Sequence, residues 1–185
     1  MTNYPTDLDC DEERRARARL VEMADRFAEE GDLRTAEWRE VFLSTWRHPY
    51  VPAYYPTLDG PPILCVDPVQ RDAWLDAVYS NQTLITKVMP VPLSRAFAPA
   101  TGWMYTSSST LPLLMLRMLE DLDVHDGDRV LEIGTGSGYN CALLCQRLGS
   151  EHVTSVDIDP ELIDLAHRTP RRQRLHAHPC CGQRG

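Results

Sequence analysis

The chain has 185 residues, of which 43% are hydrophobic and 25% charged, which is typical of one globular domain with a sizeable core. Its net charge of -8 argues against a nucleic-acid binder or a polybasic membrane-surface protein, and favours a small-molecule or peptide partner. No apolar run reaches the roughly 18 to 20 residues of a membrane-spanning helix, and the first residues are acidic, unlike a signal peptide. We therefore expect a cytoplasmic protein with no nucleic-acid or membrane partner.

The first part of the chain, residues 1–100, is predicted to be a helical and irregular extension. Apolar residues recur at helical spacing through residues 11–30, and Gly31 follows as a stop signal, so we predict an amphipathic surface helix there. A second helix is expected to start after Thr35 as its N-cap and to end near Trp46, before a proline-rich stretch.

The following region has an irregular pattern, and the sequence does not predict its order. A short helix is expected within residues 68–79. Two short β-prone runs, 83–88 and 102–106, are separated by a loop rich in proline and alanine.

Residues 101–167 are predicted to form the first part of an α/β domain. A helix is expected to be capped by Ser109 or Thr110, because hydroxyl side chains accept from free helix N–H groups and Pro112 is tolerated in a first turn. Its spacing predicts one shared apolar face, made of Leu111, Met115, Met118 and Leu122.

A strand, glycine loop, helix and strand follow. A short apolar run at 130–133 leads into three glycines, a helix is predicted over 139–148, and a second β-rich run covers 152–156. This order predicts a right-handed βαβ unit with parallel strands.

The spacing of the glycines distinguishes between ligands. Gly134, Gly136 and Gly138 allow the backbone to approach a ligand closely. A dinucleotide-binding fingerprint needs glycine or alanine three residues after its second glycine, and here that position is Tyr139. The sequence therefore argues against an NAD site, although a merely tight βα turn remains the alternative.

The order of an acid, isoleucine and the loop G-T-G-S-G resembles the first motif of Rossmann-like S-adenosylmethionine-dependent methyltransferases. The resemblance implies S-adenosyl-L-methionine as the cofactor, because its methionine end carries an amino group and a carboxylate and needs close backbone contacts with a nearby acid. Asp157, at the end of the second strand, is placed to accept the ribose hydroxyls. The predicted cofactor-binding residues are Glu132, Gly134, Thr135, Gly136, Ser137, Gly138 and Asp157.

A longer stretch is similar to the protein-L-isoaspartate O-methyltransferase family. That family places a hydroxyl-bearing segment, usually T-I-S-x-P, and a helix before the glycine motif; here residues 108–112 occupy the segment, and Thr110 stands where the family's active-site serine stands. The similarity is good over 105–167 and weak over 15–55. The serine-rich loop and the insertion before it look like the actinobacterial branch associated with modified-peptide gene clusters.

The resemblance implies an S-adenosylmethionine-dependent carboxyl O-methyltransferase that acts on aspartyl or isoaspartyl residues of a protein or peptide. Thr110 would be the catalytic residue, hydrogen-bonding the substrate or closing over the cofactor. Two readings stay open for Thr110, since a Ser/Thr cluster at this place also suits a loop and a helix cap. A small-molecule O-methyltransferase of the same fold is the other enzymatic alternative.

The end of the sequence departs from this pattern. Residues 168–185 hold five arginines and no acid, unlike the acidic chain before them, so we predict an atypical basic tail and a fold that is incomplete at its C-terminus. A two-stranded parallel sheet leaves apolar faces exposed, so we expect poor autonomous folding and weak cofactor binding. A truncated, non-catalytic methyltransferase fragment is therefore a further alternative.

The first four cysteines, at positions 10, 65, 141 and 145, are predicted to be free thiols, and no metal site is expected. Cys141 and Cys145 lie four residues apart on a predicted helix, but two ligands do not complete a zinc site. Cys180, Cys181 and the neighbouring histidines are too crowded for a recognised zinc spacing.

Overall fold

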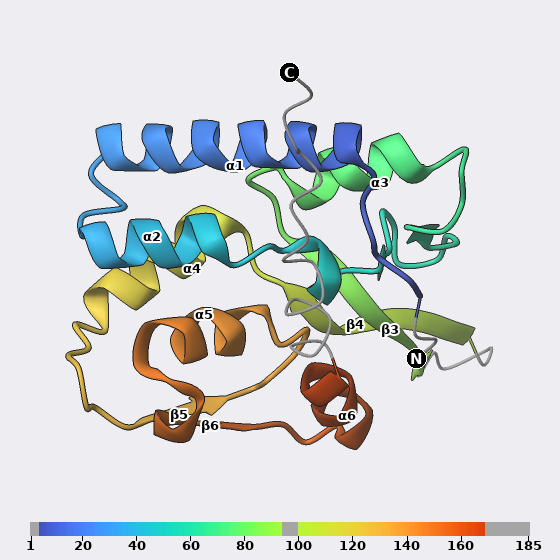
Figure 1. The fold of residues 1–185 in the computed structure, drawn as a ribbon. Coiled ribbons are helices and arrows are strands. Elements are labelled where there is room, and N and C mark those ends of the chain that lie inside the picture. The colour runs from blue at the N-terminus through green and yellow to red at the C-terminus, as the bar shows by residue number, and fades with distance from the viewer. Residues whose placement is uncertain (1–3, 94–99, 169–185) are drawn as a thin grey trace.

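The computed structural model describes residues 4–93 and 100–168 (Figure 1). Within these ranges the helices are α1 (Cys10–Glu29), α2 (Ala36–Ser44), η1 (His48–Tyr50), α3 (Arg71–Val78), α4 (Pro112–Asp121), α5 (Tyr139–Leu148), η2 (Ser150–His152) and α6 (Pro160–Arg168). The strands are β1 (Ala53–Tyr54), β2 (Ile63–Leu64), β3 (Leu84–Leu93), β4 (Ala100–Ser109), β5 (Val130–Ile133) and β6 (Val153–Val156). The predicted basic tail, residues 168–185, lies outside the described residues except for Arg168, which ends α6.

The helices form layers above a small parallel sheet. In Figure 1, α1 runs along one side of the molecule, α2 and α4 lie beneath it, and α5 separates them from β5 and β6. The α1 helix begins with a capping box. The Asp9 side chain accepts from backbone N–H groups of the first turn, and the Glu12 carboxylate accepts from the Asp9 amide. Its buried residues, among them Leu20 and Phe27, confirm the predicted amphipathic helix.

The irregular middle region contains a long antiparallel hairpin. The two predicted β-prone runs are parts of β3 and β4, which are ten residues each and pair from Leu84 with Ser109 to Leu93 with Ala100. The sequence predicted only part of the hairpin because two prolines in β3 interrupt the strand pattern. Proline is tolerated in a strand whose edge has no partner. The expected division at residue 100 coincides with the start of β4, which pairs with β3 on the other side of that division.

The prediction for α4 was wrong in two details. Its N-cap is Leu111, and the acceptors for its first turn come from another segment, because Asn81 Oδ1 accepts from the Leu113 amide at 3.0 Å. The buried side chains include Met115, Leu116 and Leu119, whereas Met118 and Leu122 are about half exposed. The buried face also includes Glu120, whose carboxylate accepts from the backbone amides of Arg34 and Thr35 before α2.

The βαβ unit is confirmed. β5 and β6 pair in parallel, from Val130 with Val153 to Ile133 with Val156, and α5 connects them. Val130 and Val153 pack against the core. The opposite face of the sheet is exposed, and its apolar residues Leu131, Ile133 and Val156 are called the outer sheet face below. Within the described residues this sheet has two strands and is covered on one face, which is unusual for parallel strands.

Three of the four tryptophans contribute to the core. Trp38 and Trp74 are buried, and Trp46 is partly buried against the same cluster. Across 4–93 and 100–168, none of the helices is long and apolar enough to cross a membrane.

Candidate functional site

A cavity of about 270 Å³ opens where the end of β4, the start of α4 and the glycine loop after β5 meet. It brings together six of the predicted site residues, one from the end of the hairpin and five from β5 and the glycine loop. The residues that line it are Ser108, Ser109, Thr110, Met115, Met118, Glu132, Ile133, Gly134, Thr135, Gly136, Ser137, Tyr139 and Asn140. Of the other two predicted site residues, Gly138 ends this loop as the N-cap of α5, and Asp157 accepts a hydrogen bond from the Gly136 amide.

The glycine loop has the backbone conformation that the sequence predicts. Gly134, Gly136 and Gly138 have φ angles of 93°, 53° and 84°, which lie in the left-handed region that other residues rarely adopt. A Cβ at Gly138 would lie 2.9 Å from the Cβ of Ala166 in α6. The glycines therefore serve two needs, a left-handed backbone and close packing against α6.

Asp157, directly after β6, stabilises the glycine loop by a hydrogen bond. Its Oδ2 accepts a hydrogen bond from the Gly136 amide at 2.9 Å, and its Oδ1 accepts from the Asp159 amide at 3.0 Å. A carboxylate has about four acceptor positions, so these two bonds leave capacity for a ligand hydroxyl. That Asp157 holds the ribose remains a prediction.

Glu132 is the centre of a polar network under the loop. Its Oε1 accepts from the Asn140 amide group at 2.7 Å, and its Oε2 accepts from the hydroxyl of Ser155. The Ser155 hydroxyl also lies 2.6 Å from the hydroxyl of Thr135, so β6 and the loop are tied to Glu132. The acid is thus held in one orientation at the cavity wall.

Asn140 presents an acceptor without a partner. Its Oδ1 is buried and makes no hydrogen bond to any residue that the structure describes, although its Nδ2 is bonded to Glu132. A buried acceptor left without a donor costs roughly 1–3 kcal/mol, so a ligand donor at this place would be favourable. The ammonium group of S-adenosylmethionine is such a donor, and the thioether side chains of Met115 and Met118 offer apolar contact nearby. These residues fit that cofactor.

Thr110 lies where β4 ends and α4 begins. It lines the cavity together with Ser108 and Ser109, opposite the glycine loop. Trp103 and Tyr105, which precede this segment in β4, are exposed and are not among the residues that line the cavity.

Lys87 connects the hairpin to the loop that follows β6. It is the only lysine in the chain, it lies at an irregularity in the β3–β4 register, and its Nζ bonds Asp159 at 2.5 Å and Glu161 at 2.8 Å. These hydrogen bonds raise the pKa of Lys87 and lower the pKa values of Asp159 and Glu161. The Asp159 amide also donates to Asp157, so the contact between Lys87 and Asp159 helps to hold Asp157, the residue predicted to bind the ribose.

The ion pair should persist only between the pKa values of its members. The carboxylates have lowered pKa values, so their contribution to the free energy of unfolding is fully present above their pKa in the unfolded chain and is lost as the pH falls through the folded pKa. Lys87 has a raised pKa, so its contribution is lost only as the pH rises through that value. Labelling lysine with ¹³C gives one resonance for this chain, and its titration midpoint should fall when Asp159→Asn and Glu161→Gln are combined. Asp164→Asn, on the same helix, should leave the midpoint unchanged; an unchanged midpoint in the double variant contradicts the contact.

In the described ranges the predicted thiols Cys10, Cys65, Cys141 and Cys145 form no disulfide. The Cys141 thiol donates a hydrogen bond to the Cys145 sulfur, and this bond, together with burial, raises the pKa of Cys141. Within 4–93 and 100–168 there is no group of three or more side chains that could hold a metal ion. The crowded Cys180 and Cys181 lie outside the described residues.

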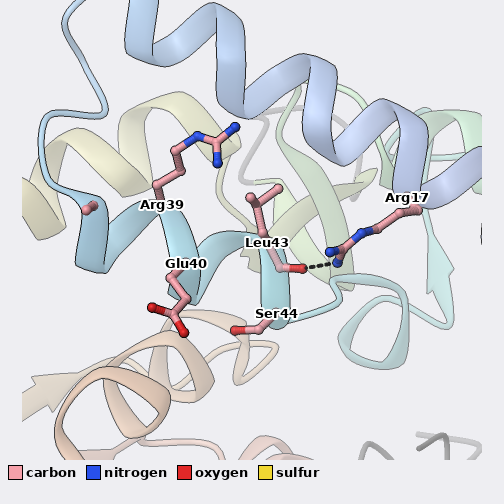
Figure 2. Close-up of a pocket in the computed structure, with 6 residues that line it drawn as sticks. Arg17, Arg39, Glu40, Leu43 and Ser44 are labelled. Carbon is pink, nitrogen blue, oxygen red and sulfur yellow. Dashed lines mark hydrogen bonds between the residues drawn. The ribbon is translucent and has the colours of Figure 1, made fainter.

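A second hollow, of about 340 Å³, lies between α1 and α2 (Figure 2). Arg17 of α1 crosses it and donates to the Leu43 carbonyl at 2.7 Å. Figure 2 shows Arg39 reaching toward α1 and Glu40 pointing away from it. Arg39 pairs with Asp25 of α1, and none of the predicted site residues lines this hollow.

Sequence reasoning missed the residues that support the site. Asn140 lies in the first turn of α5, and Ser155 is in the middle of β6, where its alternation with exposed Thr154 could have placed it on the helix-facing side. Met115 and Met118 were predicted only to share an apolar helix face, and both line the cavity. Nothing in the local pattern signalled the role of Arg47, which is described below.

A family model decides the identity of the chain. The model for protein-L-isoaspartate(D-aspartate) O-methyltransferase matches residues 64–182, which is more than half of the chain. The chain belongs to the protein-L-isoaspartate O-methyltransferase family. The match starts in β2, well before the glycine loop, and so includes the hairpin that the sequence similarity had left out.

Individual relatives agree with this family. The chain is 41% identical over 64 residues to a protein-L-isoaspartate O-methyltransferase of Methanothrix thermoacetophila, covering 34% of this chain and 30% of that protein. It is 28% identical over 154 residues to the enzyme of the same name from Pyrococcus abyssi, covering 83% and 53%. A ribosomal protein L11 methyltransferase of Symbiobacterium thermophilum is 30% identical over 142 residues, covering 77% and 41%. The chain thus spans about half, or less, of the length of the relatives it matches.

A solved structure shares the fold. A protein-L-isoaspartate O-methyltransferase superposes with a TM-score of 0.55 at 22% sequence identity, covering 86% of this chain and 39% of that one. The predicted Rossmann-like methyltransferase fold is confirmed by this match and by the parallel βαβ unit.

Proposed function

We propose that this family member binds S-adenosylmethionine in the cavity and transfers its methyl group to a side-chain carboxylate of an aspartyl or isoaspartyl residue in a protein or peptide. One observation carries the proposal: the glycine loop, the fixed acid Glu132 and the unpartnered Asn140 Oδ1 share one cavity with Thr110. The loop and the acid suit the cofactor, and Thr110 lies on the side left for the acceptor. The free cysteines support a cytoplasmic location.

The chemistry requires little from the protein beyond placement. An oxygen of the substrate carboxylate forms a bond to the methyl carbon, the bond from that carbon to sulfur breaks, and the sulfonium becomes a neutral thioether. No proton moves, because the attacking carboxylate is already ionised. The chain's residues therefore orient the two reactants and exclude water, and well-oriented reactants can account for roughly 7–11 kcal/mol of a barrier.

Thr110 is the proposed acceptor-side residue. Its hydroxyl can donate to one oxygen of a carboxylate while the other oxygen faces the methyl group. The neighbouring hydroxyls of Ser108 and Ser109 line the same wall, so this side of the cavity is polar where a charged acceptor would enter.

A non-catalytic fragment is the rival that the structure favours next. The outer sheet face is exposed, with Ile133 83% accessible beside the cavity, so one wall of the cofactor site is open to solvent. Such a site is expected to bind the cofactor more weakly than micromolar. A small-molecule acceptor is the remaining enzymatic alternative.

The purified chain tests the proposal in two steps. Titration calorimetry should give saturable binding of S-adenosylmethionine, competed by S-adenosylhomocysteine and weakened at least about tenfold in Asp157→Asn. The control Asp164→Asn removes a carboxylate from the exposed side of α6 and should bind as the wild type does. Methyl-labelled cofactor should then give a base-labile ester on an isoaspartyl peptide.

The outcomes separate the alternatives. Ester on the isoaspartyl peptide that is reduced in Thr110→Val supports the whole proposal. Binding without ester on isoaspartyl or aspartyl peptides favours the non-catalytic fragment, and ester on small carboxylic acids alone favours the small-molecule enzyme. Absence of binding at millimolar cofactor contradicts the cofactor site itself.

A further inference from the structure

Arg47 is a buried cation behind the wall of the cavity. It lies between α2 and η1 in sequence, and only 2% of its surface is accessible. Burial lowers its pKa to about 10, which still leaves the guanidinium charged at neutral pH. An arginine held in the interior needs hydrogen bonds for all of its donors, because an isolated buried charge is very unfavourable.

The guanidinium bonds two backbone segments that are distant in sequence. On one side it donates to the carbonyls of Val78, Ser80 and Gln82, at 3.2, 3.3 and 3.1 Å, in the segment between α3 and β3. On the other side it donates to Ser109 Oγ at 3.1 Å, Ser109 O at 3.0 Å and Thr110 O at 3.1 Å. All six acceptors are neutral, and among the described residues no carboxylate forms an ion pair with Arg47.

The segment on the first side holds α4 in turn. Thr83 Oγ1 accepts from the Leu111 amide at 3.2 Å, and Asn81 Oδ1 accepts from the Leu113 amide at 3.0 Å. These are N–H groups at the start of the helix, which have no partner within it. Thr110 is therefore fixed from both sides, by Arg47 at its own carbonyl and by the 81–83 segment at the residue that follows.

We propose that Arg47 is a positioning residue for the acceptor side of the site: its bonds to Ser109 and Thr110 set the place of the Thr110 hydroxyl relative to the glycine loop. The proposal rests on the proposed function for its catalytic consequence. Neutral acceptors suit this task. A carboxylate would bind the guanidinium at a single place, whereas six carbonyl and hydroxyl oxygens let the planar guanidinium link two backbone segments. The cofactor wall is built on β5, β6 and α5 and makes no bond to Arg47.

Hydrogen exchange measures the positioning without requiring activity. In Arg47→Lys, which keeps the charge but loses the fork, the amides of Leu111 and Leu113 should exchange at least about tenfold faster than in the wild type, while the amides of α1 and α5 should not change. Arg47→Gln should enlarge the effect. Ser109→Ala removes one of the six bonds and should give a smaller effect, and it is the variant to use if the Arg47 variants do not fold. The control Arg15→Gln removes an exposed arginine that pairs with Asp72 on α3 and should leave all rates unchanged.

Kinetics then tests the consequence. Arg47→Lys should lower kcat for the isoaspartyl peptide at least about tenfold, while the Kd for S-adenosylmethionine stays within about twofold of wild type. Unchanged exchange at Leu111 and Leu113, or faster exchange throughout α1 and α5, overturns the proposal, since the second result describes a general structural role. An equal loss of cofactor affinity and kcat also overturns it. If the wild type forms no ester, the proposed function fails alone, and the exchange rates still decide whether Arg47 positions this segment.

Discussion

Replacing Trp74 with alanine is expected to lower the free energy of unfolding by about 3–5 kcal/mol. The Trp74 side chain is completely buried in the core between α3 and the segment that follows η1, and its indole donates to the Val51 carbonyl at 2.7 Å. The guanidinium of Arg71 lies 4.8 Å from the ring centroid. Removal of the ring leaves a large cavity and an unpaired carbonyl. Urea unfolding followed by far-ultraviolet circular dichroism measures the loss.

Two further variants separate the causes. Trp74→Phe keeps most of the apolar volume and loses the indole donor, so it should cost about 1–3 kcal/mol. Trp103→Ala, at an exposed site on β4, should change the free energy of unfolding by less than about 0.5 kcal/mol. A Trp103 variant as damaging as the Trp74 variant contradicts this account of the core.

Gly138→Ala is expected to lower the free energy of unfolding by about 2–4 kcal/mol, because two costs combine. The residue has a φ of 84°, which disfavours any side chain, and the new Cβ would lie 2.9 Å from the Cβ of Ala166. The overlap should move α6 away from the loop, so the affinity for S-adenosylmethionine should fall as well. Chemical unfolding and calorimetry measure the two effects separately.

Gly127 supplies the matched control for this variant. It has a similar φ of 92°, but a Cβ there meets nothing within 4 Å. Gly127→Ala therefore reports the backbone cost alone, about 1–2 kcal/mol, with no effect on cofactor affinity. If the two variants lose the same stability, the contact with α6 carries no weight.

The sequence predicted best those elements whose own residues determine them. The α1 helix has an amphipathic repeat and a glycine stop, and the run from Val130 to Val156 has a strand, a glycine loop and a helix in register. The β3–β4 hairpin was predicted only in part, because its stability comes from pairing between strands, which no local pattern records. The N-terminus of α4 was predicted wrongly for the same reason, since its acceptor comes from Asn81, far away in sequence.

The site divides in the same way. Six predicted residues line one cavity, because a glycine loop after a strand determines its own shape. Asn140 and Ser155 could have been found from their helix and strand positions, but Arg47 could not. An arginine is normally exposed, and only the folded chain shows six distant oxygens around this one.

The single lysine at the β3 irregularity also affects how the chain responds to its surroundings. All other basic side chains, apart from the histidines, are arginines, and these keep their charge across the whole physiological pH range. Acylation of side-chain amines could therefore neutralise one cation only, and that cation is the one joining the hairpin to the acids at the start of α6. A modification that leaves nearly every surface ion pair of this protein intact would act selectively on the contact that supports Asp157.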